Sequence, residues 1–135
     1  MKVNFMYGIH KKLWGILSEW GAEDVPEKKL CVKSEAKRIE TIEKLGFSNG
    51  HTLYDDPPCR CVSKLIFGVY PGKFTSCQFV CPLEWSDENG NHLEWCISLH
   101  RRWRLARGEE KKKLARLIRD APLRKDTQIF YNIVE

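Results

Sequence analysis

The residues best suited to binding chemistry are basic, and they are concentrated between His100 and Arg119. This stretch, HRRWRLARGEEKKKLARLIR, holds nine lysines and arginines and one histidine against two glutamates. Phosphate recognition needs several cations on one surface, and an aromatic side chain among them adds a face on which a base can stack. The stretch therefore predicts a nucleic-acid interface made by Arg101, Arg102, Trp103, Arg104, Arg107, Lys111, Lys112, Lys113, Arg116 and Arg119.

The same charges have two other interpretations. They could form the solvated side of a helix whose Trp103 packs inward, or they could dock an acidic protein. Residues 101–126 carry a balance of +7 against −2 for the rest of the chain, whereas a solvated helix usually mixes both signs. The sequence contains no zinc-finger spacing, ribonucleoprotein motif or Gly-rich clamp loop, so contact with nucleic acid would be led by the phosphate backbone and weakly sequence-selective.

Four cysteines could supply zinc ligands in number, although their spacing is unusual. Cys59 and Cys61 form a C-x-C pair, and Cys77 and Cys81 form a C-x3-C pair. Structural zinc sites generally take paired ligands from a tight knuckle, whereas these pairs follow the apolar side of expected strands. Because free cysteine is among the most buried residue types, we expect four core residues and no metal or other cofactor.

No catalytic arrangement is evident. Cys96 and His100 lie in a segment expected to be extended, which separates them by about 13 Å and rules out a direct thiol and imidazole pair. The combination of His92 with Glu94 is typical of ordinary surfaces. Because no nucleophile, base and orienting group come from neighbouring positions, the sequence favours a non-enzymatic protein.

Apolar spacing predicts three helices. The first covers Tyr7–Gly21, with Gly21 ending it in the left-handed conformation, and the second covers Ser34–Gly46, with Ser34 as its N-cap. The third begins at Gly108, carries two glutamates in its first turn, and ends near Ala121 because Pro122 follows. The third helix contains most of the basic stretch.

Alternating apolar residues predict a sheet between the second and third helices. The segments 59–70, 74–85 and 92–100 alternate and are separated by turn residues, which is typical of an antiparallel three-stranded meander. The β-branched and aromatic run at 127–134 is expected to join this sheet as a C-terminal strand. The sequence thus predicts one α+β domain over residues 1–135, with helices covering one face of the sheet.

Composition narrows the function to two classes of binding protein. No apolar stretch is long enough for a signal peptide or a membrane span, so we expect a cytoplasmic protein without a membrane partner. The first class is a non-enzymatic nucleic-acid-binding protein that uses residues 100–119. The alternative is a protein-binding inhibitor or adaptor, such as an anti-defence protein of a mobile element, which docks on a host protein or nucleoprotein complex. Five tryptophans support the alternative, because aromatic residues are favoured at interface centres.

Overall fold

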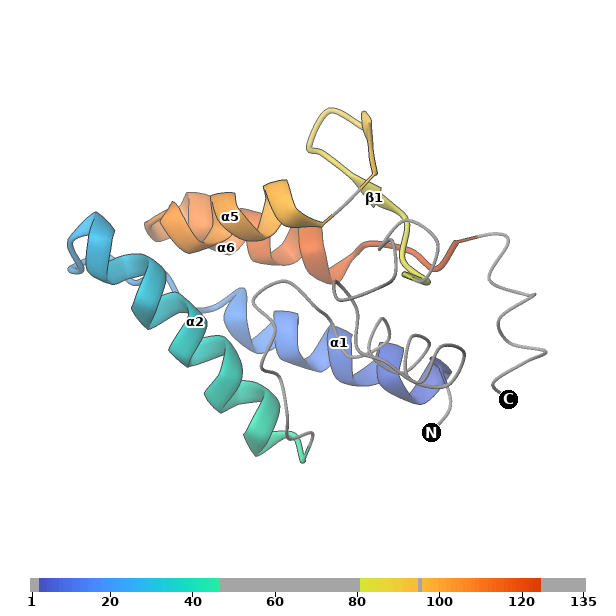
Figure 1. Cartoon of the computed structure of the whole chain (residues 1–135), viewed down its shortest axis with the longest axis horizontal. Helices are drawn as coiled ribbons and strands as arrows, with labels where there is room; N and C mark the ends of the chain where they lie inside the picture. The colour runs from blue at the N-terminus through green and yellow to red at the C-terminus, as the bar shows by residue number, and fades with distance from the viewer. Residues whose placement is uncertain (1–2, 47–80, 95, 125–135) are drawn as a thin grey trace, which may run out of the picture.

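The computed structural model describes residues 3–46, 81–94 and 96–124 of the chain. Within them the protein is mixed α+β and mostly helical, with a small two-stranded antiparallel sheet. The helices are α1 (Val3–Leu17), α2 (Glu27–Lys44), α5 (Ile97–Leu105) and α6 (Gly108–Arg119). Helices α5 and α6 lie side by side, α1 packs along α6, and α2 crosses near the end where α5 and α6 are joined (Figure 1). None of the helices described is both long and apolar enough to cross a membrane.

Helices α5 and α6 form a hairpin joined by Ala106 and Arg107. The predicted start of α6 is confirmed: Gly108 is its first residue, and Glu109 and Glu110 lie in its first turn, where carboxylates complement the helix dipole. Gly108 has a φ of +57°, and its N–H donates a 2.9 Å hydrogen bond to the Gly21 carbonyl. This bond ties the hairpin to the segment that follows α1.

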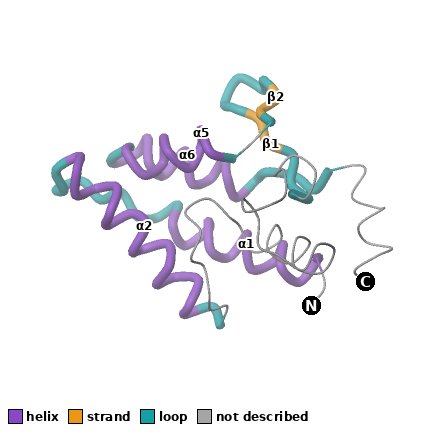
Figure 2. The backbone as a smooth tube through the Cα atoms, in the orientation of Figure 1, coloured by secondary structure: helices purple, strands orange, loops and turns teal. Residues whose placement is uncertain are grey.

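The small sheet is a tight hairpin (Figure 2). Strand β1 (Trp85–Ser86) pairs antiparallel with β2 (His92–Leu93), with Trp85 opposite Leu93. In the turn, the Asp87 carboxylate accepts 2.9 Å hydrogen bonds from two backbone N–H groups, those of Asn89 and Asn91. This turn lies beside α5 and contributes a carboxylate to the surface described below.

The predicted third strand is wrong beyond Leu93, because Ile97–Leu105 is helix α5. Its buried residues Leu99, His100 and Trp103 follow helical spacing, and over so short a run Ile97 and Leu99 fit an alternating pattern as well. The predicted strand at 59–70, most of the second strand and the C-terminal strand at 127–134 lie outside the described residues. The three-stranded meander is therefore not confirmed.

A different segment lies along the second predicted strand. Leu83 forms an antiparallel bridge with Leu123, and the N–H of Glu84 donates to the Pro122 carbonyl at 2.8 Å. The N–H of Arg124 donates to the carbonyl of residue 82 at the same distance. The chain leaving α6 thus returns alongside residues 82–84.

Two predicted helix boundaries need correction, and one is confirmed. Helix α2 begins at Glu27, so Ser34 is a buried mid-helix residue rather than a cap. Helix α1 ends at Leu17, and the left-handed residue after it is Ala22 (φ +48°) rather than Gly21. Gly46 has a φ of +83° directly after the end of α2, as predicted.

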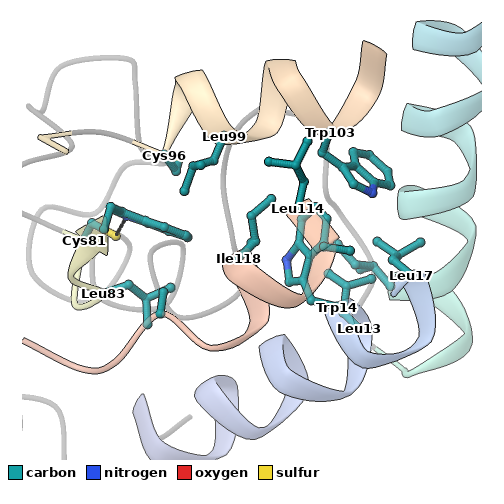
Figure 3. Packing of buried hydrophobic residues seen from close by; sticks show 14 residues of the cluster. Leu13, Trp14, Leu17, Cys81, Leu83, Cys96, Leu99, Trp103, Leu114 and Ile118 are labelled. Atoms are coloured by element: carbon teal, nitrogen blue, oxygen red, sulfur yellow. Dashed lines mark hydrogen bonds between the residues drawn. The ribbon is translucent and has the colours of Figure 1, made fainter. Parts of the chain in front are cut away.

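The core lies between α1, α5, α6 and the chain around β1 (Figure 3). Trp14 and Trp103 are fully buried and meet edge to face, with ring centroids 5.0 Å apart. Cys81, Leu83 and Trp85 are all buried, as predicted for the core side of this segment, and Pro82 between them is buried too. Trp85 Nε1 donates a 3.4 Å hydrogen bond to Cys81 Sγ, drawn as the dashed line in Figure 3. The core fixes the inner sides of α5 and α6, and their outer sides carry the more exposed residues.

Candidate nucleic-acid interface

The outer side of the α5–α6 hairpin carries most of the predicted interface. Helix α5 buries Leu99, His100 and Trp103, and α6 buries a stripe centred on Leu114 and Ile118. Eight of the ten predicted residues therefore lie at the surface. The four exposed residues are Arg101, Arg102, Arg107 and Lys113. The four half-buried residues are Arg104, Lys112, Arg116 and Arg119. We call these eight residues the cationic face.

Trp103 is not part of the cationic face. Its side chain is 0% exposed, packed against Trp14 and tilted against Trp20. A base cannot stack on a ring that the core encloses, so the stacking role predicted for Trp103 does not fit its position. The alternative interpretation, in which this tryptophan packs inward, describes it correctly.

Lys111 is also removed from the surface, with 0% of the residue exposed. Burial is the main cause that lowers its pKa to about 7, since a charged ammonium loses its hydration there. The Coulomb interaction with Cys31 opposes this lowering of the pKa, and the Arg104 cation adds to it. Of the lysines predicted to touch phosphate, this one instead belongs to the junction of α2, α5 and α6.

Three members of the cationic face are held by carboxylates. Arg102 pairs with Glu88 of the β turn at 2.9 Å and with Glu110 at 3.6 Å. Its hydrogen bond lowers the pKa of Glu88. The other two pairs are Lys112 with Glu109, at 3.5 Å, and Arg119 with Asp120, at 2.8 Å.

The remaining charges are less constrained. Within the described part of the chain, the side chains of Arg101, Arg107, Lys113 and Arg116 form no hydrogen bond or ion pair. An anion that binds these four cations does not have to break an ion pair of the protein first, although Arg116 also helps to lower the pKa of Asp120, after the larger effect of Arg119.

A groove runs between the hairpin and the β turn, with a volume of about 470 Å³. The groove is lined by three cations, which are Arg102, Lys113 and Arg116, and by three carboxylates, which are Glu88, Glu110 and Asp120. Two leucines, Leu114 and Leu117, complete the lining. The groove is thus close to neutral, and the net positive charge of the cationic face comes from residues around it.

Sequence reasoning missed one cation, Lys11 of α1. It is exposed and lies close enough to Asp120 to lower the pKa of that carboxyl, after the larger effect of Arg119. Antiparallel packing of α1 on α6 brings it there, with a His10 ring nitrogen 2.9 Å from the Ile118 carbonyl oxygen. The only signal for Lys11 in the sequence was its position on the polar side of an amphipathic helix. That signal does not reveal that α6 is the neighbouring helix.

The cysteine and histidine hypotheses are only partly tested. Cys81 is a buried thiol that accepts the hydrogen bond from Trp85, while Cys59, Cys61 and Cys77 lie outside the described residues. Cys96 and His100 sit one helical turn apart, with the His100 N–H donating to the Cys96 carbonyl at 3.0 Å, so the separation expected for a strand is wrong. Among the residues described, no group of three or more His, Cys, Asp or Glu side chains is placed to hold a metal ion.

Comparison with known proteins gives no match, since no family model, curated protein or solved structure shows significant similarity to this chain.

Proposed function

We propose that the protein binds nucleic acid through the cationic face of the α5–α6 hairpin. The observation that supports this most strongly is the set of four cations without a partner among the described residues: Arg101, Arg107, Lys113 and Arg116. They come from two adjacent helices whose inner sides are fixed in the core, so the surface is already organised before a ligand arrives.

The chemistry of this surface indicates recognition of the phosphate backbone rather than of bases. Arginine and lysine neutralise phosphates and release the counterions that surround nucleic acid. Phosphate contacts fix the position of a protein on its ligand but carry no sequence information. With Trp103 buried, the cationic face has no tryptophan on which a base can stack, and binding is expected to depend weakly on sequence.

The test is fluorescence anisotropy of a short labelled DNA duplex titrated with protein at low salt. The variant Lys113→Glu with Arg116→Glu is expected to lose at least about tenfold in affinity, because two phosphate contacts become repulsive. The matched control is Lys29→Glu with Lys33→Glu, which reverses two exposed lysines on α2 and gives the same net charge. Equal losses in the two variants would show that net charge, rather than the cationic face, drives binding.

A protein partner is the second candidate, and the groove with its two leucines is the observation that favours it. Leu114 and Leu117 line the groove among mixed charges, and Leu105 on α5 is 47% exposed. Apolar contact surrounded by charges is typical of protein interfaces. Absence of DNA and RNA binding at low salt, together with stoichiometric capture of an acidic protein that Leu117→Glu abolishes, would favour this candidate over the first.

A further inference from the structure

Lys111 is a buried cation whose hydrogen-bond partners are all uncharged. Its Nζ donates to the Ser34 hydroxyl at 2.7 Å and to the backbone carbonyls of Trp103 at 2.5 Å and Arg104 at 3.4 Å. The ring centroids of Trp103 and Trp20 lie 4.3 Å and 5.2 Å from the same atom. No carboxylate among the described residues forms an ion pair with it.

Three segments packed around Lys111 provide the groups that set its charge. Helix α2 provides the Cys31 thiol and the Ser34 hydroxyl, and α5 provides the Arg104 guanidinium. The segment after α1 provides only the ring of Trp20. Carbonyls and rings favour the protonated ammonium, while burial and the nearby arginine oppose it, so the two forms are close in free energy.

This buried amine contacts one member of the cationic face, because its Nζ donates a hydrogen bond to the Arg104 carbonyl. It belongs to α6, and it binds the last carbonyls of α5, beside the connection that carries Arg107. A phosphate placed on Arg104 or Arg107 offsets the positive potential at this end of the hairpin. The Coulomb interaction with such a phosphate favours the protonated form of Lys111.

We propose that binding of nucleic acid to the cationic face is coupled to uptake of a proton by Lys111, so that affinity falls as the pH rises above neutrality. This inference rests on the proposed function and adds its regulation. The coupling is reciprocal: a ligand that favours the protonated lysine must bind more tightly to the protein that already carries the proton.

The pH range follows from the free protein, in which the pKa of Lys111 is lowered to about 7. An ordinary exposed lysine stays protonated throughout the neutral range and could not respond. If bound nucleic acid raises the pKa of Lys111 by about one unit, Lys111 has one pKa in the free protein and a higher one in the complex. The affinity for nucleic acid is then about tenfold higher at a pH below both values than at a pH above both. Surface lysines and arginines contribute no such step, since they remain charged.

The experiment measures the dissociation constant of a short labelled DNA duplex from about pH 6 to about pH 9 at fixed low salt. Wild-type protein and Lys111→Met are compared, because methionine fills a similar volume without a titrating group. The expected result is a loss of wild-type affinity across this range that exceeds the loss for Lys111→Met by about tenfold. A flat wild-type profile, or equal losses in both proteins, would overturn the coupling.

A second measurement covers the case in which Lys111→Met fails to fold. The side-chain carbon resonances of lysine in wild-type protein, followed against pH by NMR, are expected to show one lysine titrating far below the others, with its midpoint raised when the duplex is bound. A midpoint that the duplex leaves unchanged overturns the coupling alone. No binding of the duplex at any pH overturns the proposed function itself, so the two failures are distinguishable.

Discussion

At the scale of single residues, Lys111 should give the protein an unusual dependence of stability on pH. The pKa of an ordinary lysine, as in the unfolded chain, is 10.5, and the pKa of Lys111 in the folded protein is about 7. At a pH between these two values, the unfolded chain therefore binds more protons than the folded protein. The free energy of unfolding is therefore expected to rise with pH in this window, by up to about 1.4 kcal/mol per pH unit, and to be flat below it.

Chemical denaturation of wild-type protein and Lys111→Met at several pH values measures this effect. The quantity to follow is the difference in the free energy of unfolding between the two proteins, which should grow in favour of wild type as pH rises. Lys113→Met, which removes an exposed lysine, is the control and should track wild type. A constant difference between wild type and Lys111→Met would mean that carbonyls and rings keep this lysine charged.

Substitutions of Trp103 distinguish a role in core packing from a role in contact with nucleic acid. Trp103→Ala is expected to destabilise the protein by about 3–5 kcal/mol because it opens a cavity among Trp14 and its neighbours. Leu105→Ala, at a 47% exposed position of the same helix, should change stability by no more than about 0.5 kcal/mol. Trp103→Phe should leave affinity for single-stranded DNA within about twofold, and a larger loss in a folded protein would revive the stacking role.

At the scale of elements, two glycines should respond oppositely to the same substitution. Gly108 starts α6 with a φ of +57°, where a Cβ atom is strained, so Gly108→Ala should destabilise the protein by about 1 kcal/mol. Gly8 lies within α1 with nothing within 4 Å of a Cβ atom, so Gly8→Ala should stabilise it by about 0.5–1 kcal/mol. Thermal unfolding compares the two, and a stabilising Gly108→Ala would contradict the conformation of the α5–α6 connection.

The helices differ in how far the sequence predicts them, and the reason is local chemistry. Helix α6 carries its own signals: a glycine start, acids in its first turn and a leucine stripe. Helix α5 does not, since its first turn holds no acidic residue and the residues before Leu99 fit an alternating pattern too. The positions of Trp103 and Lys111 depend on α1 and α2 packing against the hairpin, which no local pattern encodes.

At the scale of the whole molecule, the charge distribution predicts how binding should depend on salt. Of the eight residues in the cationic face, Arg102, Lys112 and Arg119 are paired with carboxylates of the protein, and Arg104 makes other interactions within it. That leaves the four cations without a described partner. If all four release counterions from duplex DNA, the logarithm of the binding constant should fall against the logarithm of the salt concentration with a slope of about −3.6.

Anisotropy titrations at several salt concentrations measure this slope directly, and its value distinguishes three arrangements. Lys113→Glu with Arg116→Glu should make the slope shallower by roughly two, because two of the four contacts disappear, whereas the α2 control should leave it unchanged. A wild-type slope near −7 would mean that all eight cations reach phosphates, which requires the pairs with Glu88, Glu109 and Asp120 to open on binding. A slope near zero would instead assign the attraction to uncharged contacts, and would favour the groove and its leucines over the cationic face as the binding surface.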